Sequence, residues 1–198
     1  MIDFSSVESF EKRIASFFGS KHAVAVDSCT HGIELSLRHT RAKEIVVPNR
    51  TYISVPFLAN KLNIRLAWND QEWKDFYYLT DRVIDAAVLW KRNSYLPGTL
   101  MSVSFQYKKH LSLGRGGAIL TDNREDFLEL KKMSYDGRIP GVPWREQDIE
   151  SVGYHYYMTP ETAELGLSKI DCAINEKPRQ WVYNDWPDLR KMSVFHNE

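Results

Sequence analysis

The chain opens with apolar residues at helical spacing. From Phe10 to Phe17 they recur every three or four residues, and Gly19 follows as a typical helix terminator. Ser5 and Glu8 have the spacing of a capping box, in which the two residues satisfy each other's free backbone N–H groups. We therefore predict an amphipathic packing helix over residues 6–18.

Short apolar runs rich in β-branched residues follow, and polar stretches separate them. The runs are Ala23 to Val26, Ile45 to Val47, Ile64 to Trp68, Val83 to Ala87, Leu100 to Phe105 and Ala118 to Thr121. Runs of this length and composition are typical of buried strands. Helical spacing between some of them, such as Ile33 with Leu37, gives an alternation of strands and helices. This alternation predicts an α/β fold with a mainly parallel sheet flanked by helices.

The second half of the chain contains a long irregular segment between two predicted helices. Residues 124–133 have helical spacing, and apolar residues from Ala163 to Ile174 form a helical stripe. Residues 134–153 contain several glycines and prolines, so we expect a long loop, a feature that is often functional in compact domains. We expect one domain over residues 1–176 and a polar tail with several tryptophans over residues 177–198.

Composition and charge narrow the choice of partner. The chain has 198 residues, enough for one domain, and its 26 Lys and Arg equal its 26 Asp and Glu. No net charge attracts nucleic acid or anionic lipid, so we expect a small-molecule partner. No run reaches the length of a membrane span and the first residues lack a signal-peptide pattern, which favours a cytoplasmic protein. Cys29 and Cys172 lack metal-ligand spacing, so we expect reduced thiols and no metal site.

The most informative stretch, residues 104–117, joins a strand end to lysines and a glycine-rich turn. It reads SFQYKKHLSLGRGG and begins at Ser104. An α/β sheet binds ligands beyond such strand ends. A hydroxyl and free backbone amides suit a phosphate, and a partly desolvated lysine can add to an aldehyde. The residues alone leave open a simpler interpretation, a basic surface loop before a hairpin.

This stretch resembles the active-site motif of the sugar aminotransferases of the DegT/DnrJ/EryC1/StrS family. Their pattern is Ser-Phe, three residues, Lys, four residues and Gly-Glu-Gly-Gly. The positions in register are Ser104, Lys109, Gly114, Gly116 and Gly117, with Arg115 in place of the glutamate. The resemblance implies that Lys109, rather than Lys108, forms a Schiff base with pyridoxal 5'-phosphate. It also implies that the Ser104 hydroxyl contacts the cofactor phosphate.

Two further segments resemble family segments that contact opposite ends of the cofactor, its pyridine nitrogen and its phosphate. The run Val-Ile-Asp-Ala-Ala around Asp85 is similar to the strand that delivers an aspartate to the pyridine nitrogen, where a carboxylate keeps that nitrogen protonated. Residues 28–31, Ser-Cys-Thr-His, resemble a Ser-Gly-Thr loop that opens a helix. The resemblance implies that the Thr30 hydroxyl and the His31 amide bind phosphate. Without it, Asp85 is a turn residue and Ser28 or Thr30 an N-cap.

Two more segments imply a ring contact and a second subunit. Residues 48–52 resemble the segment that places an aromatic residue over the cofactor ring, which makes Tyr52 the candidate for stacking; alone it would be a core tyrosine. Residues 153–158 resemble Gly-Tyr-Asn-Tyr-Arg-Met, whose asparagine reaches the phosphate of the partner subunit. His155 stands in that place and can donate to phosphate. The resemblance thus implies a homodimer with shared active sites.

The resemblance extends from about residue 10 to residue 174 and has several departures. We expect a shortened form that lacks the C-terminal small domain of a usual family member, and residues 69–82 are too few for the strand and helices that the family has there. Val88 replaces a glutamine or histidine near the cofactor's phenolic oxygen, and Tyr157 replaces an arginine. These changes bear on substrate contacts.

The resemblance implies the large domain of a fold-type I aminotransferase, dependent on pyridoxal phosphate, that acts on a nucleotide-linked keto sugar with an amino acid such as glutamate as donor. Lys109 would hold the cofactor and shuttle a proton as general base and acid. The missing domain motivates an alternative, a catalytically degenerate cofactor-binding or interaction protein of the same fold. A plain α/β domain without cofactor leaves the spacing of Lys109 to coincidence. Some sugar dehydratases of the family have histidine at the lysine position, but the glycine spacing favours Lys109 over His110.

Overall fold

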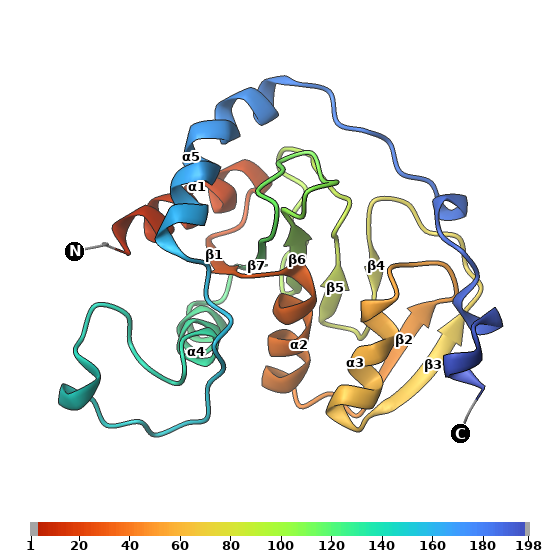
Figure 1. The fold of residues 1–198 in the computed structure, drawn as a ribbon, viewed down its shortest axis with the longest axis horizontal. Helices are drawn as coiled ribbons and strands as arrows, with labels where there is room; N and C mark the ends of the chain where they lie inside the picture. The colour runs from red at the N-terminus through yellow and green to blue at the C-terminus, as the bar shows by residue number, and fades with distance from the viewer. Residues whose placement is uncertain (1–3, 197–198) are drawn as a thin grey trace.

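A five-stranded mixed sheet organises the chain, which the computed structural model describes over residues 4–196 (Figure 1). In spatial order its strands are β1 (His22–Val26), β7 (Gly117–Thr121), β6 (Leu100–Ser104), β5 (Val83–Asp85) and β4 (Tyr77–Tyr78). Two further strands, β2 (Glu44–Pro48) and β3 (Arg65–Asn69), form a parallel pair. The backbone N–H of Val46 donates to the carbonyl of Leu79 at 2.9 Å, which links this pair to the larger sheet.

Helices cover both faces of the larger sheet: α1 (Ser5–Phe18) and α5 (Pro160–Asn175) lie on one, and α2 (Cys29–His39) and α4 (Arg124–Ser134) lie on the other. Helix α3 (Ser54–Leu62) packs against β2 and β3. Alternate residues of β1 face opposite ways: Ala23 and Ala25 pack with α1 and α5, whereas Val24 and Val26 pack with α2 and α4. Because both faces are buried, the strands are continuous apolar runs. Within residues 4–196, no helix combines the length and the apolar character that crossing a membrane requires.

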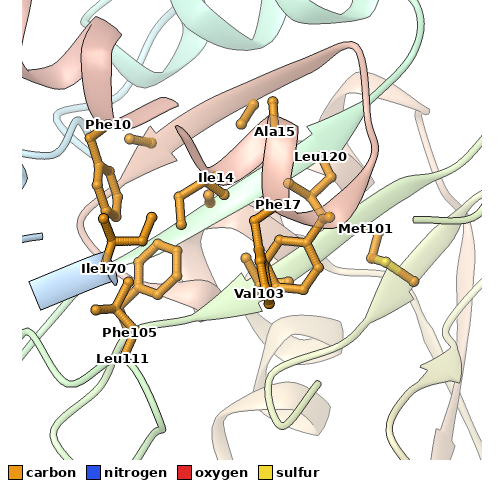
Figure 2. Close-up of a cluster of buried hydrophobic side chains, with 14 of the residues drawn as sticks. Phe10, Ile14, Ala15, Phe17, Met101, Val103, Phe105, Leu111, Leu120 and Ile170 are labelled. Atoms are coloured by element: carbon orange, nitrogen blue, oxygen red, sulfur yellow. The ribbon is translucent and has the colours of Figure 1, made fainter. Parts of the chain in front are cut away.

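The largest core cluster lies between α1, α5 and the sheet (Figure 2). Phe10 of α1 is fully buried, and its ring meets that of Phe105 edge-on at 5.3 Å between centroids. On α5, a Cβ at Gly166 would lie 2.5 Å from Cε2 of Phe10. The two helices therefore pack closely only because position 166 has no side chain. This packing fixes the loop after β6, which begins at Phe105.

The α/β class is confirmed, but the larger sheet is mixed where we expected mainly parallel pairing. Only β5 and β6 pair in parallel, whereas β1 with β7, β7 with β6, and β4 with β5 are antiparallel. The reason is connectivity: β6 reaches β7 through the loop of residues 105–116, without the crossover helix that a parallel neighbour needs. The predicted strands and helices are all present, whereas α3 and β4 were not predicted. Residues 135–159 form the long loop, with one 3₁₀ turn at Trp144–Glu146.

Residues 177–196 pack against β2, β3 and α3 (Figure 1). Leu189 is buried, and its N–H donates to the carbonyl of Asn49 at 2.7 Å. The ring of Phe195 contacts those of Phe57 and Trp68. Three 3₁₀ turns, Tyr183–Asp185, Leu189–Lys191 and Ser193–Phe195, give the segment its local structure. This part of the chain is thus fixed to the domain through specific contacts.

Candidate active site

A cavity of about 670 Å³ lies where β5 and β6 end and α2 begins. Its volume is in the range of small-molecule and cofactor sites. Five residues singled out from the sequence line it, although they come from separate segments: Thr30, Tyr52, Asp85, Ser104 and Lys109. The fold therefore brings most of the predicted site together at the carboxyl ends of neighbouring strands, as expected for an α/β sheet.

Lys109 reaches the cavity from the loop between β6 and β7. Its backbone N–H donates to the carbonyl of Gln106 at 2.7 Å. Nζ lies 4.7 Å from the ring centroid of Trp181 and 5.7 Å from that of Trp186. Burial lowers the pKa of this amine, and the negative charge of Asp85 opposes the effect. Because its neutral form is reached at lower pH than in a solvated lysine, the amine is suited to act as a nucleophile or base.

Lys108 has different surroundings. Its side chain is exposed, and Nζ lies 5.5 Å from the ring centroid of Tyr107, itself an exposed residue. The two adjacent lysines also line the same cavity, so the difference between them is burial rather than location. The sequence-based choice of Lys109 over Lys108 stays a prediction that labelling can test.

Asp85 is the buried acid of the cavity, with 4% of its surface exposed. One carboxylate oxygen accepts a short hydrogen bond from the Tyr77 hydroxyl, and the other accepts from the N–H of Ala87 at 2.8 Å. Burial raises the pKa of Asp85, while the bonds from Tyr77 and Ala87 and the charge of Lys109 lower it. The Tyr77 hydroxyl is also bonded to Oγ1 of Thr51 at 2.6 Å. This network orients a carboxylate towards positively charged groups in the cavity.

The start of α2 forms the polar end of the cavity. Oγ of Ser28 accepts from the backbone N–H of His31 at 3.2 Å, so Ser28 is the N-cap. Oγ1 of Thr30 is bonded to Oγ of Ser54, the first residue of α3, at 2.7 Å. Ser104 adds a fourth hydroxyl at the end of β6. Hydroxyls grouped around a helix N-terminus are suited to an anion such as phosphate.

Gly117 explains how α2 can begin so close to β7. A Cβ at this position would lie 2.5 Å from the backbone N of Cys29 and 2.7 Å from the backbone C of Ser28. Both are backbone atoms, so a side chain here would displace the helix start. Gly114 has a different role, because its φ of 80° lies in the left-handed region that favours glycine. The glycine-rich motif thus positions the polar end of the cavity.

The two predicted histidines do not line the cavity with their side chains. Nδ1 of His31 is bonded to Asp27 at 2.6 Å, and its ring stacks on Tyr156 with centroids 3.7 Å apart. The predicted contribution of His31 was its backbone amide, which Ser28 caps. His155 is 71% exposed at its side chain and pairs with Asp136 at 3.1 Å. An exposed position is what the resemblance implies for a residue that acts on a second subunit, and that role stays a prediction.

Several residues that line the cavity were missed from the sequence. Arg179, Trp181, Asp185 and Trp186 come from the segment predicted as a polar tail. The tryptophans there were the one available signal, because indole side chains are infrequent in a solvated tail. Tyr77 had no sequence signal of its own, since its bond to Asp85 exists only when β4 lies beside β5.

The amine of Lys109, the buried acid of Asp85 and the N-terminus of α2 thus surround one cavity. The chain belongs to the DegT/DnrJ/EryC1/StrS aminotransferase family, whose family model matches residues 1–93 and 96–179. This match confirms the resemblance drawn from the sequence.

Individual relatives are distant in sequence. The spore coat polysaccharide biosynthesis protein SpsC of Bacillus subtilis (strain 168) is 25% identical over 218 residues, which cover 83% of this chain and 56% of that protein. Among solved structures, AtS13 from Actinomadura melliaura has a TM-score of 0.73 at 19% identity, over 86% of this chain and 61% of that one. The PLP-form of Spr1654 from Streptococcus pneumoniae has a TM-score of 0.69 at 19% identity, over 84% and 59%. The structures confirm the fold-type I architecture, and this chain spans between half and two thirds of the length of these three proteins.

Proposed function

We propose that this chain is a pyridoxal-phosphate-dependent aminotransferase that moves an amino group from an amino acid such as glutamate to a nucleotide-linked keto sugar. The supporting observation is that the amine of Lys109 and the carboxylate of Asp85 line one cavity with the start of α2. Membership of an aminotransferase family and the likeness to a polysaccharide biosynthesis protein agree with a sugar substrate.

The residues of the cavity fit the cofactor by their chemistry. Pyridoxal phosphate, when bound, supplies an aldehyde that a lysine amine can join and a ring that accepts electrons from a carbanion. Thr30 and Ser104, with the first amides of α2, would bind its phosphate. Asp85 would pair with the ring nitrogen, and Tyr52 would lie against the ring. One cavity thus offers an anion-binding end, an acid and an amine.

Each side chain then has a definite task. Asp85 is held by Tyr77 and Ala87, and its charged form would favour a proton on the group that it faces. Lys109 can accept a proton at Nζ from the substrate α-carbon and return it, because burial makes the neutral amine accessible. The hydroxyls of Thr30 and Ser104 fix orientation rather than move protons.

One observation favours a second candidate, a degenerate cofactor-binding or interaction protein. Val88 lies beside Lys109 and gives that wall of the site an apolar side chain, where the resemblance implies a hydrogen-bonding residue. A protein of this kind would bind the cofactor without transferring an amino group. Spectroscopic conversion of the bound cofactor to its amine form by glutamate would favour the enzyme, and a spectrum unchanged by glutamate would favour the second candidate.

Labelling tests the assignment directly. The protein is incubated with pyridoxal phosphate, reduced with borohydride and digested, and the modified peptide is identified by mass spectrometry. We expect the label on Lys109 and its loss in Lys109→Ala. Lys108→Ala is the matched control and should be labelled as in the wild type. A label on Lys108, or none at excess cofactor, would contradict the proposal.

The homodimer is also part of the proposal, since the resemblance implies that His155 reaches the phosphate in the other subunit. Its exposed side chain agrees with such a contact. Sedimentation of the wild type should give twice the mass of 23.1 kDa, and His155→Ala should weaken cofactor binding without changing the label position. A monomer at all concentrations would remove this part of the proposal.

A further inference from the structure

The segment of residues 179–186, here called the C-terminal wall, lines the cavity beside Lys109. It contributes Arg179, Trp181, Asp185 and Trp186. The indoles of Trp181 and Trp186 stack with centroids 5.5 Å apart and planes within 15° of each other. Trp186 also meets the ring of Tyr52 edge-on at 6.1 Å. The C-terminal wall is therefore part of the site and contacts two of its predicted residues.

The C-terminal wall is held in place by the residues just after β2. Nη1 of Arg50 donates to the carbonyl of Trp186 at 2.6 Å. The Tyr183 hydroxyl bonds to the side-chain oxygen of Asn49, whose own side-chain nitrogen donates to Asp188 at 3.3 Å. These bonds lie immediately before Tyr52 in the chain. They fix the C-terminal wall relative to the cavity through the loop that also positions that ring.

The guanidinium of Arg179 is 61% exposed and is only loosely paired within the protein. In the part of the chain that the structure describes, the guanidinium of Arg179 has one ionic partner, Asp185, at 3.7 Å, and its ring contact with Trp181 uses the π face. The indole Nε1–H of Trp186 is buried without a hydrogen-bond partner among the described residues. This buried N–H is therefore not accessible from the cavity, whereas the exposed guanidinium of Arg179 lines the cavity.

The charges of the cavity favour an anion on this side. Four cationic side chains line it, Lys108, Lys109, Arg115 and Arg179, against two carboxylates, Asp85 and Asp185. Arg115 is neutralised by Asp27, at 2.8 Å. Arg179 also borders a smaller hollow lined by Val88 and His110, which does not include the residues that begin α2. Ser104 borders this hollow together with Arg179, whereas Thr30 does not.

We propose that Arg179 binds an oxyanion of the incoming substrate. This inference rests on the proposed aminotransferase function and specifies one side chain that recognises the substrate. A guanidinium offers paired N–H groups that match a carboxylate or a phosphate in two bonds. Two substrates of the proposed reaction contain such a group, the amino donor through its carboxylate and the nucleotide sugar through its diphosphate.

Calorimetric titration of the full chain tests this, using L-glutamate and UDP as separate probes. The borohydride-reduced protein is used because it cannot turn over, and the cofactor-free protein is titrated beside it. Arg179→Gln should weaken at least one probe by about 10-fold or more, because a charge-assisted pair is lost. Arg179→Lys should recover part of the loss, since it keeps the charge without the paired geometry. Arg145→Gln, at an exposed position outside the cavity, is the control.

The pattern of losses identifies the source of the oxyanion. A loss for glutamate alone assigns Arg179 to the donor, a loss for UDP alone assigns it to the nucleotide, and a loss for both assigns it to a shared position. Equal affinities in Arg179→Gln and the control, or no binding of either probe to the wild type, would overturn the inference. Absence of borohydride label at Lys109 would count against the proposed function and not against the role of Arg179. The role of Arg179 is tested separately, by comparing the affinities of the variants in the cofactor-free chain.

Discussion

Gly117→Ala tests whether the start of α2 is placed by the glycine-rich motif. The added Cβ would lie 2.5 Å from the N of Cys29 and 2.7 Å from the C of Ser28. A flexible side chain could move aside, but these are backbone atoms of the N-cap and of the first helical residue. Relief of the clash therefore requires β7 and α2 to separate at the polar end of the cavity.

The magnitude follows from the cost of overpacking. Forcing extra atoms into a packed interior costs about 1–3 kcal/mol, and a domain of this size loses about 2–4 °C of Tm per kcal/mol. We expect Tm to fall by roughly 2–12 °C. Since displacement of the helix start removes charge-assisted bonds from the phosphate, affinity for pyridoxal phosphate should fall by about 10-fold or more.

Gly114→Ala is the matched control within the same motif. Nothing lies within 4 Å of a Cβ at Gly114, but its φ of 80° makes any side chain strained. That strain costs about 1–2 kcal/mol without moving α2, so Tm should fall while cofactor affinity stays near the wild-type value. Thermal unfolding and equilibrium dialysis of the cofactor measure both quantities. If Gly117→Ala bound the cofactor as tightly as Gly114→Ala, the assignment of the α2 start to phosphate binding would be refuted.

Two other predictions concern the acid and the amine. Tyr77→Phe removes a hydroxyl bonded to both Asp85 and Thr51, so it should lower the free energy of unfolding by about 1–3 kcal/mol in urea and weaken cofactor binding; unchanged values for both would contradict the network. Burial lowers the pKa of Lys109 below its usual 10.5, so reductive methylation followed by mass mapping should show its pH midpoint below 10.5. Between the lowered pKa and 10.5 the unfolded chain binds more protons at this position, so the stability contributed by Lys109 increases with pH in that range. A midpoint of 10.5 or above would count against burial of the amine.

Hydrophobic pattern was sufficient for the strands and for most helices. Ala23 to Val26 and Ala118 to Thr121 are continuous apolar runs because helices cover both faces of the sheet, so each residue has an apolar neighbour whichever way it points. Helix α1 could be predicted because only one of its faces is buried, so its apolar residues recur with the helical period. Local apolar patterns therefore predict the strands of the sheet and the helices that cover it, because all of these elements bury apolar side chains in the core.

Features that depend on pairing between distant segments were not visible. Helix α3 was not predicted, because Pro56 lies in its first turn, where proline is tolerated but is usually taken as a breaker. The direction of β7 depends on the loop before it rather than on its own residues. Residues 179–186 were predicted as part of a polar tail, since their charged and polar positions hide the two indoles that face the cavity.

Sequence motifs identified the groups of the site, but the properties of those groups come from residues far away in the chain. In the sequence, Lys109 does not differ from the lysine beside it. In the fold its amine is desolvated by surroundings that include the indoles of Trp181 and Trp186, more than seventy residues further along the chain. Asp85 is a strand-end aspartate until Tyr77 donates to it from a neighbouring strand. A shifted pKa requires both a titratable group and an environment, and the motif contains the first alone. The C-terminal wall therefore contributes to the properties of the site, because its two indoles contact the amine of Lys109, whose pKa is lowered by burial.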